Sequence, residues 1–102
     1  METLLSIAHW NKRTFNTTEQ QQRAKVKEEF EEYMQDPSSE ELADTLIAVI
    51  GLARHGRQWK QLFYAVLALG TERYSKEEIY NAVVFKMEIN RKRIWLGSHH
   101  IL

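Results

Sequence analysis

Residues 28–44 read EEFEEYMQDPSSEELAD, and this stretch decides the fold. It predicts the end of one helix, a tight turn and the start of a second helix. Proline disfavours helical geometry at the residue before it, so the first helix should end at Asp36-Pro37. Ser38 is followed three residues later by Glu41, a capping-box pattern that predicts a new helix. We therefore expect two antiparallel helices joined by a short turn.

Carboxylates lie symmetrically about this turn, with Glu29 and Glu32 before it and Glu41 and Asp44 after it. In an antiparallel pair, the inner two should lie level with each other, and so should the outer two. Carboxylate oxygens are the ligands that Mg²⁺ prefers, so the pattern predicts a site for Mg²⁺, or for Mn²⁺ in its place. The plainer alternative is a solvated acidic face, because most charged side chains point to water.

A helical wheel distinguishes these glutamates from their neighbours. At about 100° per residue, Val26 and Tyr33 mark the apolar stripe of the first helix. Glu29 falls beside that stripe and Glu32 on its border, whereas Glu31 points toward water. A buried carboxylate needs a cation or a hydrogen-bond donor, because an unpaired buried charge is very costly. The wheel therefore favours Glu29 and Glu32 as metal ligands.

Composition limits the class of protein. The 102 residues suit a single domain over the whole range 1–102. The formal net charge of +0 gives no reason to expect a polymeric nucleic acid or a membrane as partner. The sequence has no cysteine, which excludes disulfides and thiolate zinc sites. With no signal-peptide pattern and no long apolar run, we expect a cytoplasmic protein.

The pattern along the chain is that of an all-α protein, a bundle of four to five helices. One proline and four glycines leave little material for long turns. The expected helices cover residues 4–12, 18–34, 38–55, 59–69 and 75–93, and residues 95–102 are expected to form a loose tail. Two further capping boxes are expected at helix starts, one from Thr17 or Thr18 with Gln20 or Gln21 and one from Ser75 with Glu78.

The helix that follows Ser38 is apolar on nearly every side, so we expect it to be buried at the centre of the fold. Covering it and the apolar segment 59–69 should require a second copy of the chain, which predicts a homodimer. Small residues, Ala48 and Gly51, continue the face that starts with the carboxylates. They leave room for a ligand or allow close helix packing, and the sequence leaves both open.

The last helix changes character along one face. Ile79 and Val83 define an inward apolar stripe, and the same face continues through Lys86, Asn90 and Arg93. Lysine and arginine suit phosphate oxygens, and an asparagine can hold a sugar hydroxyl. The alternative is that these cations pair with the acidic helices of the same chain.

Trp10 lies on the short first helix. Its ring could stack on a nucleotide base, although a tryptophan at such a place is more often part of the core. The sequence contains no GxxxxGK[ST] loop, so a P-loop nucleotide site is excluded.

These motifs resemble a known family. EExxE at residues 28–32, followed by ExxD at residues 41–44, is similar to the all-α nucleotide pyrophosphohydrolases, the MazG-like superfamily. The run from Lys86 through Asn90 to Arg93 resembles the final helix of these enzymes. The resemblance extends from about Ile7 to Trp95. The turn over residues 33–40 is shorter than is usual in the family.

The resemblance implies a Mg²⁺-dependent enzyme that converts a nucleoside triphosphate to the monophosphate and pyrophosphate, a reaction that cleanses nucleotide pools. Four carboxylates would be metal-binding and catalytic, and four other residues would contact the substrate: Lys86, Asn90, Arg93 and Trp10. The family forms dimers or tetramers, so these cations could reach a nucleotide held by the partner's carboxylates. Two alternatives stay open, a non-catalytic helical interaction protein and a related dUTPase-like or phosphoribosyl-ATP pyrophosphohydrolase.

Overall fold

A computed structural model describes the backbone from Met1 to Ile101 and the side chains through Arg93. The predicted all-α class is confirmed, and no strand occurs in the described range. The elements follow in this order: α1 (Leu4–Thr14), α2 (Glu19–Gln35), α3 (Ser39–Ile50), the 3₁₀ helix η1 (Gly51–His55), α4 (Trp59–Gly70) and α5 (Lys76–Ile101).

The helix starts follow local hydrogen bonding. A full capping box forms at Thr18, whose hydroxyl accepts from the backbone N–H of Gln21 while the Gln21 side chain accepts from Thr18. Ser75 and Glu78 form another at the start of α5. Each box satisfies two backbone donors that the first turn leaves free. Both boxes were predicted from the sequence.

The third predicted box is only half formed. The Glu41 N–H donates to the Ser38 hydroxyl at 3.1 Å, which caps α3. The Ser38 N–H already donates to the Asp36 carbonyl at 2.7 Å, so the Glu41 side chain is not needed there. The Glu41 carboxylate is therefore free to take part in the acidic cluster.

The tight turn between α2 and α3 is held from both sides. The last helical hydrogen bond of α2 runs from the Asp36 N–H to the Glu32 carbonyl. The Tyr74 hydroxyl donates to the Pro37 carbonyl at 2.6 Å and fixes the turn to the α4–α5 connection. On the other side, the Thr45 hydroxyl of α3 lies 3.1 Å from the Glu29 carbonyl of α2 and 3.0 Å from the Glu41 carbonyl of its own helix, so its single hydrogen is shared between the two acceptors. These bonds fix the register in which the carboxylates meet.

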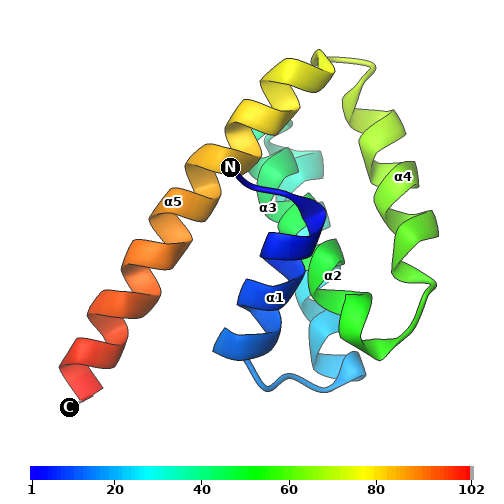
Figure 1. The fold of residues 1–102 in the computed structure, drawn as a ribbon. Coiled ribbons are helices and arrows are strands. Elements are labelled where there is room, and N and C mark those ends of the chain that lie inside the picture. The colour runs from blue at the N-terminus through cyan, green and yellow to red at the C-terminus, as the bar shows by residue number, and fades with distance from the viewer. Residues whose placement is uncertain (102) are drawn as a thin grey trace.

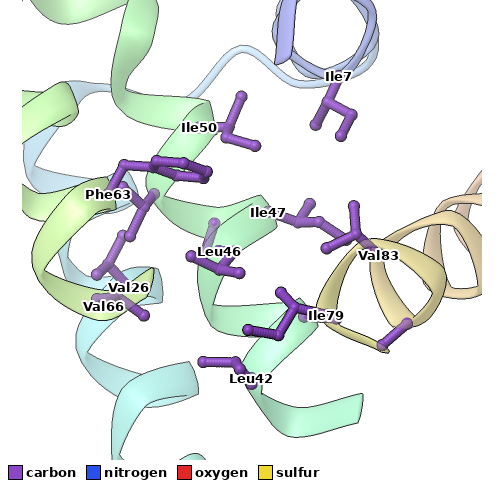
Figure 2. Packing of buried hydrophobic residues seen from close by; sticks show 14 of the residues in the cluster. Ile7, Val26, Leu42, Leu46, Ile47, Ile50, Phe63, Val66, Ile79 and Val83 are labelled. Carbon is purple, nitrogen blue, oxygen red and sulfur yellow. The ribbon is translucent and has the colours of Figure 1, made fainter. Parts of the chain in front are cut away.

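Helix α3 is the centre of the molecule. It packs against α2, α4 and α5, and α4 and α5 lie on opposite sides of it (Figure 1). Figure 2 shows apolar side chains from α1, α2, α4 and α5 converging on Leu46 and Ile50 of α3. All residues from Thr45 to Ile50 are buried. A single chain therefore covers α3, and the prediction that this helix needs a partner for its burial is wrong.

The ends of two helices differ from the predicted ends. Helix α3 stops at Ile50 and the chain continues as η1 to His55, before Gly56 takes a φ of 142° that favours glycine. Helix α5 continues to Ile101, beyond the predicted end near Arg93, and Leu102 lies outside the described residues. Between Arg93 and Ile101 the residue of lowest helical propensity is Gly97, and glycine costs a helix only about 1 kcal/mol relative to alanine. In the described part of the chain, no helix has the length and apolar character to cross a membrane.

Candidate metal and nucleotide site

Three of the predicted carboxylates come together between α2 and α3. Glu29, Glu41 and Asp44 each offer an oxygen, and these oxygens lie within 4.8 Å of one another. Glu29 comes from α2, and the other two lie on the first turns of α3, one helical turn apart. The short turn and the antiparallel pairing therefore produce the predicted acidic cluster, which we call the carboxylate triad.

The triad fits a hard divalent cation. Glu29 is 8% exposed, and its Oε2 is buried without a hydrogen-bond partner. Oε2 of Glu41 is also buried without a partner. A buried carboxylate oxygen with no donor is costly unless a cation satisfies it. Oxygen ligands from three carboxylates are the donor set that Mg²⁺ or Mn²⁺ accepts, with water completing the coordination.

Glu32 does not belong to the triad. Its side chain is exposed, whereas Glu29, one turn earlier on α2, is buried. The border position on the wheel therefore lies outside the helix interface in the folded chain. The Glu29 carboxylate still raises the pKa of Glu32 by charge repulsion, with smaller effects from desolvation and from Glu41. Glu32 is thus a neighbour of the triad that faces solvent.

The two triad carboxylates on α3 both have a raised pKa. Desolvation raises the pKa of Glu41, and the charges of Asp44 and Glu29 raise it further. Desolvation also raises the pKa of Asp44, although Lys86 opposes this effect. Both carboxyl groups thus hold a proton more firmly than they would in the unfolded chain, as expected for clustered like charges.

Two lysines pair with the triad. Lys86 of α5 lies 3.2 Å from Oδ2 of Asp44, measured from its Nζ. This contact supports the intramolecular pairing that the sequence left as an alternative. Lys25 of α2 places its Nζ 2.8 Å from Oε1 of Glu29 and was not predicted. Its position four residues before Glu29 is the usual spacing of a helical ion pair, which could have indicated it.

A cavity of about 480 Å³ opens beside the triad. Its walls come from α1, α2, α3 and α5, and both Glu29 and Asp44 line it. The polar residues predicted on the last helix also line it: Lys86, Asn90 and Arg93. One chain therefore brings the predicted cations to its own carboxylates, and it does so without a contribution from a partner.

Trp10 is buried, as in the core alternative that the sequence left open. It is 7% exposed, and its ring meets Phe15 edge to face with 5.5 Å between centroids. It also lines the cavity. The tryptophan is thus a core residue with one surface at the site, and the aromatic pair forms an apolar wall suitable for a flat ring.

Buried polar residues that the sequence did not suggest complete this wall. Gln22 is 4% exposed and donates from Nε2 to the Ala48 carbonyl at 2.8 Å. Asn11 is 5% exposed, and its Oδ1 has no partner. Gln22 lies four and seven residues before Val26 and Glu29, a spacing that could have placed it on the inner face.

The small residues of α3 have different roles. A Cβ on Gly51 would lie 2.4 Å from Nε2 of Gln22 and 2.9 Å from Nδ2 of Asn11, so a glycine is needed for close packing there. Ala48 lines the cavity, where its small side chain leaves space. The sequence left open whether these small residues leave room beside the carboxylates or allow close helix packing. Gly51 allows close packing, whereas Ala48 leaves room in the cavity.

Comparisons with protein-family models, with curated proteins and with solved structures found no match to this chain.

Proposed function

We propose that the protein is a Mg²⁺-dependent nucleoside triphosphate pyrophosphohydrolase, which converts a ribo- or deoxynucleoside triphosphate and water to the monophosphate and pyrophosphate. One observation carries the proposal: the cavity has carboxylates at Glu29 and Asp44 and cationic or polar groups on α5 around the same space. A polyphosphate needs both a divalent cation and direct positive contacts. The α–β cleavage point rests on the resemblance to MazG-like enzymes.

Each side chain has a role in this reaction. The triad would hold Mg²⁺ or Mn²⁺, and the bound cation would neutralise phosphate charge. A glutamate at the site would accept the proton of the attacking water. Glu32 suits this role, because it lies beside the triad and is not one of the three residues that would hold the cation.

The remaining groups of the cavity would bind the substrate. Lys86 and Arg93 would contact phosphate oxygens and stabilise their charge as the bond to pyrophosphate breaks. Asn90 would hold a sugar hydroxyl, and Trp10 with Phe15 would contact the base through the apolar wall. The substrate in this proposal is a free nucleotide in the cytoplasm, where the enzyme would cleanse the nucleotide pool.

A panel of nucleotides tests the proposal. The protein is incubated with Mg²⁺ and each ribo- and deoxynucleoside triphosphate, with dUTP and phosphoribosyl-ATP included, and pyrophosphate release is measured with and without EDTA. We expect Mg²⁺-dependent pyrophosphate release from at least one triphosphate. Activity confined to dUTP or to phosphoribosyl-ATP would select the corresponding related enzyme. If no nucleotide is hydrolysed or bound, the non-catalytic interaction protein becomes the better explanation.

We also propose that the protein assembles as a homodimer, or as a tetramer built from dimers. The support is an apolar groove of about 470 Å³ between α2 and α4, lined by Phe30, Leu62, Val66 and Leu69. Val26 and Ala65 also line this groove. Large apolar surfaces on a small domain are commonly covered by a second copy.

A further inference from the structure

The two lysines that pair with the triad neutralise its three carboxylates unequally. Lys25 binds one oxygen of Glu29 and leaves the other buried without a partner. Lys86 binds one oxygen of Asp44. Among the residues whose side chains are described, no ion pair involves Glu41. The folded chain thus supplies two cations for three carboxylates, and each cation lies on a carboxylate that would bind the metal.

A divalent cation and the two lysine ammonium groups would repel one another if all three contacted the triad. The triad oxygens lie within 4.8 Å of one another, so a metal among them would be near both lysines. Like charges at such distances repel strongly, especially where burial reduces screening by water. Both lysines can move, because a flexible four-carbon stem carries each ammonium group. The Lys25 side chain is 53% exposed, and Lys86 lines the open cavity.

We propose that Lys25 and Lys86 are internal counterions of the empty triad, which a divalent cation displaces when it binds. The inference rests on the proposed metal site and assigns these two residues a role in controlling it. Displacement would release two ammonium groups beside the cavity, where they become available to an anionic ligand. Metal binding would then prepare the cavity for phosphate, because the chain's own carboxylates no longer neutralise these cations.

The arrangement has a thermodynamic consequence. In the metal-free protein each lysine competes with the metal for a carboxylate, so each lowers the affinity for the metal. Removing a competing charge should therefore raise that affinity, although it also removes a phosphate contact. A coupling of this kind typically changes an equilibrium constant by about 5- to 150-fold. Lys27 is a matched control, since it lies on the same helix as Lys25 and pairs at 4.0 Å with the exposed Glu31.

Metal binding without any nucleotide tests the proposal. MnCl₂ is titrated calorimetrically into the full chain and into Lys25→Met, Lys86→Met and Lys27→Met, after circular dichroism has confirmed that each variant folds. We expect the first two variants to bind Mn²⁺ at least about 5-fold more tightly than the wild type, and Lys27→Met to match the wild type. In a parallel Mg²⁺ titration, the ammonium resonances of Lys25 and Lys86 should move, while that of Lys27 should not.

The outcomes separate this inference from the proposed function. Equal Mn²⁺ affinity in all four proteins, with unmoved lysine resonances, would overturn the counterion role and leave the metal site intact. If neither the wild type nor any variant binds Mn²⁺, the metal site itself fails, and the counterion proposal fails with it. Tight Mn²⁺ binding only in Lys25→Met and Lys86→Met would support the inference, since it would show that these two lysines compete with the metal for the triad.

Discussion

Glu41 is the carboxylate of the triad that the folded chain compensates least. Its pKa is raised above the ordinary 4.5, chiefly by desolvation and then by the charges of Asp44 and Glu29. Above pH 4.5 the folded state therefore binds more protons at this site than the unfolded state, and stability decreases as the pH rises through the folded pKa. We predict that Glu41→Gln raises the melting temperature of the metal-free protein at neutral pH.

Thermal melts in EDTA across the acidic to neutral range check this prediction. The stabilisation by Glu41→Gln should be small near pH 4.5 and should grow toward pH 7, because the wild-type carboxylate then loses its proton. Glu40→Gln is the matched control, since Glu40 is exposed on the same helical turn. A destabilised Glu41→Gln at pH 7 would contradict the repulsion argument.

Glu29 and Glu31 differ by two positions on α2 and point in opposite directions. Glu29 is buried with a free oxygen, whereas the Glu31 side chain is 59% exposed. Loss of an outer-shell partner of a metal typically costs about 10–100-fold, so the loss of a ligand should cost at least as much. We predict that Glu29→Ala reduces pyrophosphate release by about 100-fold or more. Glu31→Ala should keep nearly full activity, and the reverse ranking in steady-state assays would show that a different face of α2 holds the metal.

At the same scale, the sequence predicted the triad and offered Lys86 as one of its partners, but it did not suggest Lys25. Glu29, Glu41 and Asp44 could be predicted because a short turn and a helical repeat fix their positions with few assumptions. Glu32 lies outside the triad because a border residue on a wheel becomes buried or exposed according to how the two helices rotate against each other. That rotation depends on long-range contacts, such as the bond from Thr45 to the Glu29 carbonyl.

Glu2, which lies just before α1, forms hydrogen bonds with two residues of helix α5. Arg91 forms a forked pair with Glu2 at 2.9 and 3.0 Å, and the Tyr80 hydroxyl donates to the Glu2 carbonyl at 3.0 Å. The N-terminus lies beside the middle of α5, and the C-terminal half of that helix extends away from the bundle (Figure 1). The ion pair between Arg91 and Glu2 therefore holds α5 close to α1. Asn90 of α5 and Trp10 of α1 line the cavity from these two helices.

We predict that Arg91→Gln lowers the free energy of unfolding by about 0.5–1 kcal/mol at pH 7, a value discounted for the partial exposure of Arg91. The hydrogen bond and charge of Arg91 lower the pKa of Glu2, so this stabilisation is present above pH 4.5 and is lost as the pH falls through the folded pKa. Urea denaturation at pH 7 and at decreasing pH below 4.5 measures it. Lys92→Gln, an exposed neighbour, should change little at any pH. A difference between the two variants that persists in strong acid would show that Arg91 acts by packing rather than by charge.

Among the elements, the helix starts were easier to predict than the ends. Thr18 and Ser75 mark starts through capping side chains, whose partners lie three residues away. The ends of α3 and α5 carry no comparable local signal, since the helix can continue as a 3₁₀ turn or through a single glycine at little cost. The order and number of helices were therefore predictable, whereas their lengths depended on packing.

Within one chain, carboxylates and cations of the proposed site line the same cavity, and this changes the expectation for an oligomer. Asp44 and Arg93 line the same cavity of a single protomer. Mixing inactive Asp44→Ala protein with inactive Arg93→Ala protein should therefore recover no activity, even if the two chains associate. Recovery to about a quarter of the wild-type rate, the statistical share of intact sites expected when subunits exchange, would show that partners share the site.

The sequence predicted that apolar surface on two segments, the helix after Ser38 and residues 59–69, would require a second copy. The structure buries α3 and leaves the groove between α2 and α4 open. Helical periodicity identifies how much of a helix is apolar, whereas only the tertiary arrangement shows which apolar face remains uncovered. The oligomer remains a proposal, and its interface should now lie along α4.

We predict that the protein sediments as a dimer of 12.1 kDa chains at micromolar concentration, and that Ala65→Glu converts it to a monomer. Ala65 lines the α2–α4 groove and is exposed, so a glutamate there is solvated in the monomer. In the dimer its charge would lose that solvation in an apolar interface, a cost that Arg23 and Lys27 of the same groove would offset only in part. Ala68→Glu is the matched control, because Ala68 is exposed on the same helix outside the groove. Sedimentation velocity with circular dichroism separates dissociation from unfolding. A wild type that is monomeric and fully active would defeat the dimer, whereas a dimer unaffected by Ala65→Glu would place the interface on another face.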